Sequence, residues 1–274
     1  MPRFALATLN HSPLHGIPSQ WSAHLDAAVE AGFDALAPDV FWLRALVEEG
    51  FALSTLSEEM KARDLSCMEI AGIAIGAPEA TRAELEENLR YAEALEAEFV
   101  NARIVAPMDA AVVESFGQCV EAFAKVGTEV ALEFSRGTTL QGIADARALI
   151  ESASKGGGVT LDTWHFFLAP SGPDWEALAD LPLSQFANVQ LSDGVPYPEG
   201  AFPKATMNER RMPGEGEFDF SRLAEVLREK EFDAEGRGAI VVEVLNADWR
   251  ARPLEGFATT LIEASRKALA RSGG

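Results

Sequence analysis

Four polar side chains in the second half of the chain stand where short apolar runs end. These are Glu133 within ALEFSRG, Asp162 within VTLDTWH, Gln190 within NVQLSDG and Glu243 within IVVEVLN. Such runs are typical of buried parallel strands, and the carboxyl ends of barrel strands meet at one rim. Carboxylates that converge there without a matching buried Lys or Arg repel one another, so the pattern predicts a bound cation.

Carboxylate and amide oxygens favour hard divalent ions such as Mg²⁺ or Mn²⁺ over zinc. Structural roles are open for the same residues. Glu133 and Asp162 could cap the helices that follow their strands, and Glu243 could pair with Arg250 or Arg252. The Gln190 amide could equally be a satisfied polar strand end.

Strand-like and helix-like segments alternate along the whole chain. This pattern predicts a single (β/α)₈ TIM barrel over residues 1–274. A doubly wound sheet would need fewer strands or a second domain. The expected strands are 3–9, 33–38, 66–72, 99–105, 129–134, 158–162, 186–192 and 239–245, and the expected helices are 21–31, 54–64, 81–98, 110–126, 139–154, 175–179, 219–230 and 255–271.

The composition excludes several classes of function. The net charge of −20, without a Lys/Arg cluster, argues against binding to nucleic acid or to an anionic membrane. No apolar run reaches the ~18 residues of a membrane span, and the N-terminus lacks the apolar region of a signal peptide. Cys67 and Cys119 show no metal-type spacing. We expect a cytoplasmic protein with a small-molecule substrate, and the sequence is compatible with a homo-oligomer.

Five pieces between residues 130 and 246 resemble the xylose isomerase-like barrel superfamily of sugar-phosphate isomerases and epimerases. They are LEF, LDTWH, VQLSDG, ERRMPGEGEFD and VVEV. The resemblance implies one divalent metal ion, Mn²⁺ or Mg²⁺, held by Glu133, Asp162, Gln190 and Glu243. Gln190 departs from the family pattern, because the isomerases and epimerases usually have His at this place.

The same resemblance implies roles toward a substrate. His165 and Arg210, with Arg211 as the neighbouring alternative, match residues that contact substrate oxygens. The implied reaction is isomerisation or epimerisation of a sugar, sugar phosphate or related polyhydroxy compound through an enediolate. Glu133 and Glu243 would then exchange the proton from opposite faces.

Two other functions stay open. A metal-dependent lyase, similar to dehydroshikimate dehydratase and acting on a cyclic hydroxy acid, could use the same enolate chemistry. Those dehydratases carry a histidine two residues after the strand-5 glutamate, where this chain has Ser135. A non-catalytic binding protein is the third reading, although the acidic positions are intact.

Several further residues have two possible roles each. Arg103 could contact an acidic substrate or pair with Glu69 inside the barrel. His11 and His15 follow the first strand and could contact substrate. In the irregular 193–216 segment, Tyr197 and Lys204 could belong to a lid, because a long loop in a compact domain is usually functional. Aromatic side chains could line a pocket wall or pack in the core; these are Phe41, Trp42, Trp164, Phe166 and Phe167.

Overall fold

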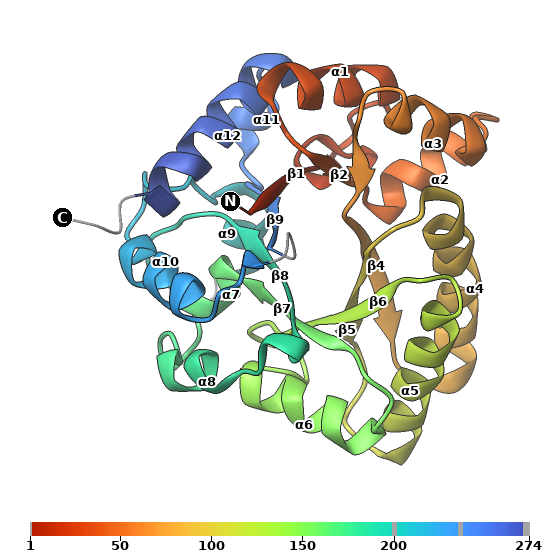
Figure 1. Ribbon diagram of the computed structural model, residues 1–274, viewed down its shortest axis with the longest axis vertical. Helices are drawn as coiled ribbons and strands as arrows, with labels where there is room; N and C mark the ends of the chain where they lie inside the picture. The colour runs from red at the N-terminus through yellow and green to blue at the C-terminus, as the bar shows by residue number, and fades with distance from the viewer. Residues whose placement is uncertain (1, 199–201, 235–237, 271–274) are drawn as a thin grey trace.

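The computed structural model describes residues 2–198, 202–234 and 238–270. Nine parallel strands form a nearly closed barrel, and helices surround it on the outside (Figure 1). The strand order is β3-β2-β1-β9-β8-β7-β6-β5-β4. The strands are β1 (Arg3–Ala7), β2 (Ala35–Ala37), β3 (Ser66–Cys67), β4 (Glu69–Ile75), β5 (Phe99–Ile104), β6 (Glu129–Glu133), β7 (Gly158–Asp162), β8 (Phe186–Leu191) and β9 (Ala239–Val242).

The prediction of a single TIM barrel is confirmed, and β3 and β4 together take the place of its third strand. They stand at the two ends of the strand order but are adjacent in the chain, separated only by Met68. Backbone hydrogen bonds continue across this join, from the Met68 amide to the Leu36 carbonyl (2.8 Å) and from the Ala71 amide to the Pro38 carbonyl (2.9 Å). The expected strand 66–72 is therefore divided in two.

The helices follow the predicted order, with several differences. The short helices α7 (Thr163–Phe167) and α11 (Ala247–Arg250) were not predicted, and α6 begins at Ile143 instead of residue 139. α2 was not predicted; the Asp39 carboxylate caps it by accepting from the amides of Phe41 and Trp42. α4 begins at Pro78 instead of Thr81, and α9 lies within the segment expected to be irregular. The helices are α1 (Trp21–Ala31), α2 (Val40–Glu48), α3 (Leu53–Lys61), α4 (Pro78–Leu95), α5 (Ala110–Ala124), α6 (Ile143–Ala153), α7 (Thr163–Phe167), α8 (Trp175–Asp180), α9 (Phe202–Asn208), α10 (Phe220–Glu229), α11 (Ala247–Arg250) and α12 (Leu254–Ala270).

The last strand ends earlier than expected because a side chain takes over its hydrogen bonds. The Asn10 amide nitrogen donates to the Val242 carbonyl (3.0 Å), and the Asn10 amide oxygen accepts from the Val244 backbone amide (2.7 Å). The chain therefore leaves the strand at Glu243. This turn places the Glu243 side chain at the carboxyl end of the barrel.

Side chains alternate between two layers along the strands, as strand geometry requires. One layer packs large apolar residues against the helices. The other faces the barrel interior and contains small side chains from one half of the barrel: Ala5, Ala7, Ala35, Ala37, Met68, Ala239 and Val241. Across the described residues, none of the helices is both long and apolar enough to cross a bilayer.

Candidate active site

The four polar strand-end residues come from neighbouring strands in one continuous order. Glu133 ends β6, Asp162 ends β7, Gln190 lies near the end of β8, and Glu243 follows β9 directly. Asp162 is in register with Gln190, and Gln190 with Val241. Gln190, Asp162 and Glu243 are buried, and the Glu133 side chain is 12% exposed. The two glutamates thus flank the Asp162–Gln190 pair.

His165 completes a compact group with two of the carboxylates. Its Nε2 atom lies 3.3 Å from Oε1 of Glu133 and 3.5 Å from Oδ2 of Asp162. One ligand atom from each of the three residues lies within 4.8 Å of the others, which suits a divalent metal ion. Asp162 also caps α7, because its Oδ1 accepts from the Trp164 amide at 2.8 Å.

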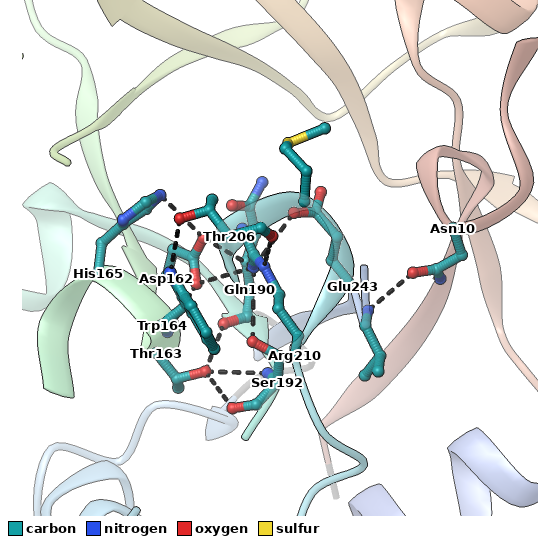
Figure 2. Close-up of polar contacts among 12 residues, drawn as sticks. Asn10, Asp162, Thr163, Trp164, His165, Gln190, Ser192, Thr206, Arg210 and Glu243 are labelled. Atoms are coloured by element: carbon teal, nitrogen blue, oxygen red, sulfur yellow. Dashed lines mark hydrogen bonds and ion pairs between the residues drawn. The ribbon is translucent and has the colours of Figure 1, made fainter. Parts of the chain in front are cut away.

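Arg210 corrects one premise of the sequence interpretation, which found no buried cation to match the carboxylates. Its guanidinium is buried between Asp162 and Glu243 (Figure 2). Nη1 lies 3.1 Å from Oδ2 of Asp162 and 3.3 Å from Oε1 of Glu243. Nε donates to the Thr206 carbonyl at 3.0 Å, and the guanidinium lies 5.6 Å from the Trp164 ring centroid. Glu243 therefore pairs with Arg210 and not with Arg250 or Arg252.

The Asp193 carboxylate holds the segment that carries Arg210. It accepts hydrogen bonds from the amides of Gly194 (2.7 Å), Gly214 (2.9 Å), Gly216 (2.8 Å) and Phe218 (3.1 Å). A Cβ atom on Gly216 would lie 2.2 Å from Oδ1 of Asp193, so only glycine fits this turn. Asp193 is fully buried and organises the loop around the Pro213–Gly216 turn.

Gln190 is held by a buried carboxylate from the opposite side of the barrel. Its Nε2 donates to Oε1 of Glu69 at 2.8 Å, and Nδ2 of Asn188 donates to Oε2 of Glu69 at 2.5 Å. Of the two alternatives for Arg103, the ion pair with Glu69 is therefore wrong, because two amides occupy the carboxylate instead. Oε1 of Gln190 is buried and has no hydrogen-bond partner among the described residues.

The carboxyl groups differ in proton affinity. Burial raises the pKa of Glu243 to about 8, and the charge of Arg210 offsets only part of this effect. Burial likewise raises the pKa of Glu69 to about 7. Burial acts in the same sense on Glu133, but the hydrogen bond and charge of His165 hold its pKa below the usual value. A divalent cation would lower the pKa of each group that it contacts.

The donor set fits a divalent metal ion. Four acidic side chains gather here (Glu69, Glu133, Asp162 and Glu243), whereas the buried Arg210 pairs with two of them, Asp162 and Glu243. The orphaned oxygen of Gln190 offers a further donor. An ion at this place would compete with Arg210 for Asp162 and Glu243.

The cavity above this group has a volume of about 270 Å³. Leu14, Phe41 and Leu245 contribute apolar wall, while Asn101 and Arg103 line it from β5. Asn101 and Arg103 are two residues apart on one strand, so their side chains share a face. Arg103 is exposed and forms no ion pair within the described part of the chain, and Nδ2 of Asn101 is buried without a partner there.

A sequence model of the family described as Xylose isomerase-like TIM barrel matches residues 25–270. The chain belongs to this family. No curated protein sequence matches it.

Solved structures of this architecture superpose over almost the whole barrel. One is titled as the IolI protein with a binding zinc atom (TM-score 0.83, 16% identity, 99% of each chain covered). A D-allulose 3-epimerase from Methylomonas sp. has a TM-score of 0.73 at 14% identity, with 97% of each chain covered. A probable 3-DHS dehydratase, AsbF, from Bacillus anthracis has a TM-score of 0.74 at 15% identity, with 96% of this chain and 99% of that chain covered. At these identities the likeness shows the shared fold.

In this xylose isomerase-like barrel, three residues that were expected to contact substrate do not line the cavity: Arg211, His11 and His15. Arg211 is exposed and donates to the Glu215 carbonyl (3.2 Å), and it does not line the cavity. His11 is buried against Phe257, at 4.8 Å between ring centroids, and His15 does not line the cavity either. Leu14 from the same loop reaches the cavity instead.

The expected lid residues are only partly described. Tyr197 stacks on Trp164 at 5.8 Å, whereas Lys204 is exposed beside Glu209. Residues 199–201 of the 193–216 segment lie outside the described residues. Among the aromatics, Trp42, Trp164 and Phe166 are buried, Phe167 packs against the core, and Phe41 alone of this group lines the cavity.

Sequence reasoning missed Asn101 and Thr206 as cavity residues and Glu69 as a partner of the site. Asn101 lies two residues before Arg103 on the same strand, so the alternation of side chains along a strand could have placed it on the same inward face. The partners of Glu69 could not be found this way, because they lie on β8, more than a hundred residues away.

Proposed function

We propose that this chain is a divalent-metal-dependent isomerase or epimerase of a small polyhydroxy compound. The observation that carries the proposal is the placement of Glu133 and Glu243 on the outer members of four adjacent strand ends, with Asp162 and Gln190 between them. A substrate held above the middle pair presents opposite faces of one carbon to two carboxylates. This is the arrangement that removal and return of a proton requires.

The proposed metal ligands are Glu133, Asp162, Gln190 and Glu243, with His165 also within ligand reach. When bound, a divalent cation would polarise a substrate carbonyl and its neighbouring hydroxyl and so acidify the C–H between them. Mn²⁺ or Mg²⁺ suits the mainly oxygen donors.

The side chains of the protein supply the proton transfer and the orientation. Glu133 accepts the proton from one face, and Glu243 returns a proton from the other. His165 and Arg210 donate to substrate oxygens. Exclusion of water by the buried cavity floor would keep the two carboxyl groups from exchanging protons freely with solvent.

Arg103 would bind an anionic group of the substrate, a phosphate or a carboxylate. Its guanidinium lines the cavity and forms no direct ion pair among the described residues, although its charge acts on Glu133, in a protein of net charge −20. Asn101 lies beside it with a free amide donor. The shared chemistry is recognition of an oxyanion by N–H donors.

A lyase that eliminates water from a cyclic hydroxy acid is the second candidate. Arg103 favours it because a guanidinium pairs well with a substrate carboxylate. Elimination needs one base and one acid, which the same pair of glutamates could supply.

The test uses the purified enzyme loaded with Mn²⁺ or Mg²⁺ and a panel of sugar phosphates, free ketoses and cyclic hydroxy acids in deuterated water. An isomerase or epimerase gives a product with the mass of the substrate plus solvent deuterium. A lyase gives a product that is lighter by one water. No exchange across the panel, or no metal bound by the wild-type protein, would overturn the proposal.

A further inference from the structure

Glu69 is a fully buried carboxylate that the proposed reaction does not use. It lies on β4, across the barrel interior from β8, and both of its oxygens accept from amide nitrogens of β8. Oε1 binds Nε2 of Gln190, and Oε2 binds Nδ2 of Asn188. In both contacts the amide nitrogen faces a Glu69 oxygen, so Glu69 accepts from both amides.

This contact fixes which end of the Gln190 amide faces the cavity. The amide has one nitrogen and one oxygen, and the nitrogen is turned to Glu69. Oε1 is then left buried without a partner among the described residues, in a side chain that lines the cavity with Glu133 and His165. A buried acceptor without a partner is unfavourable unless a donor or a cation satisfies it.

We infer that Glu69 is a positioning residue that holds the Gln190 amide with its oxygen toward the metal site. In this orientation the glutamine can act as an oxygen ligand. Because the metal site is part of the proposed function, this role of Glu69 depends on it. Without the Glu69 carboxylate the amide can rotate and present its nitrogen, which cannot ligate. Outer partners of metal ligands act in this way in other proteins.

Three variants isolate this role. Glu69→Gln keeps the shape but brings an NH₂ group against one of the two amides, so one amide has to turn over. Gln190→Glu makes the ligand a carboxylate, whose two oxygens are equivalent and have no orientation to lose. Glu98→Gln is the matched control, because Glu98 pairs with Arg3 (2.6 Å) at the amino-terminal end of the barrel strands.

The measurement is the dissociation constant for Mn²⁺, from the electron paramagnetic resonance signal of the free ion. We expect E69Q to weaken binding about 10- to 100-fold, the usual effect of losing an outer partner of a ligand. In the Q190E background the same E69Q change should have no such effect, and E98Q should leave affinity unchanged. Unchanged affinity in E69Q, or an equal loss in both backgrounds, would overturn the role of Glu69.

A measurement on the wild-type protein covers the case in which E69Q does not fold. The side-chain NH₂ signals of Gln190, assigned by their absence in Q190E, should exchange slowly with water before and after Mg²⁺ is added. Fast exchange in either state would overturn the inference. Absence of Mn²⁺ binding by the wild type would instead count against the proposed function, so the two failures are distinguishable.

Discussion

Nη1 of Arg210 lies 3.1 Å from Oδ2 of Asp162, so a buried guanidinium shares the carboxylate cluster with any metal ion that binds there. The same atom reaches Glu243 at 3.3 Å. A divalent ion would need to take these oxygens from the arginine. Release of Arg210 toward the cavity would then leave its donors free for substrate oxygens, which couples metal loading to substrate binding.

Replacement of Arg210 by methionine tests this competition. R210M leaves two buried carboxylates without their counter-ion, so we expect the free energy of unfolding without metal to fall by about 3 kcal/mol. The rise in melting temperature on adding Mn²⁺ should be larger for R210M than for the wild type, since no guanidinium has to be displaced. Equal shifts, measured by calorimetry at the same metal concentration, would exclude the competition.

Glu133→Gln and Glu243→Gln test the two-carboxylate mechanism. Each variant keeps the size of the side chain but can neither accept nor deliver a proton, so turnover on the substrate identified by the panel should fall at least ~100-fold. The E98Q variant serves as the control and should retain wild-type turnover. Near-normal activity in either site variant would remove that glutamate from the mechanism.

Arg103→Met tests the anion contact. Loss of a charge-assisted hydrogen bond of about 1.5–3 kcal/mol should raise KM for an anionic substrate roughly 10-fold or more. KM for an uncharged analogue should change little, because such a compound has no anionic group for Arg103 to bind; the charge of Arg103 also lowers the pKa of Glu133, so turnover is compared separately. An equal rise in KM for both compounds would point to a general packing defect.

Asp193→Asn tests whether the hydrogen bonds of the Asp193 carboxylate hold the loop that positions Arg210. The amide places an NH₂ group among four backbone donors, so we expect a loss of at least about 2 kcal/mol in the free energy of unfolding. Metal-dependent activity should fall as well, since the turn positions the arginine. Gly216→Ala should behave similarly because its Cβ would lie 2.2 Å from the carboxylate. Wild-type stability in both variants would contradict this account.

His24 predicts an acid-sensitive stability. Burial lowers the pKa of His24 from 6.5 to about 4, and only the hydrogen bond to the Gln20 carbonyl works against this change. The unfolded chain therefore takes up the proton first, and stability falls as the pH drops from about 6.5 toward 4. The full loss is about 3 kcal/mol for this residue. Denaturant titrations between pH 7 and 4 should show a smaller loss in His24→Gln; an unchanged slope would exclude His24 as its source.

The barrel and the polar strand ends could be predicted because both depend on local pattern. Apolar runs and amphipathic stretches alternate with the period of β/α units, and each of Glu133, Asp162 and Glu243 lies at the end of its own strand or directly after it. The exact ends of individual helices and strands were harder to predict. Residue 242 ends the last strand because Asn10, more than two hundred residues earlier, supplies the next hydrogen bond.

The electrostatics of the site could not be predicted from one sequence. Arg210 lies in an irregular segment, and its position depends on pairing of its neighbours with Asp193 and Asn246. The sequence offered only Arg103, on the next strand, as a partner for Glu69, whereas its partners are amides across the barrel. Only the closed barrel decides that β8 faces it, because the interior contacts join strands that are not adjacent in the sheet.

The hydrogen bonds of the Asp193 carboxylate affect how the sequence of this barrel could evolve. They tie residues 193–194 to 214–218, while Glu209 pairs with Asn246 on the far side of Arg210. The stretch from 195 to 208 thus begins and ends at fixed anchor points. Thr206 and Met207 from this stretch line the cavity, so changes in their side chains would alter the cavity while the two anchors keep the arginine beside the carboxylates. Substrate range and catalytic chemistry can therefore vary separately, and this stretch is the natural place to graft new specificity.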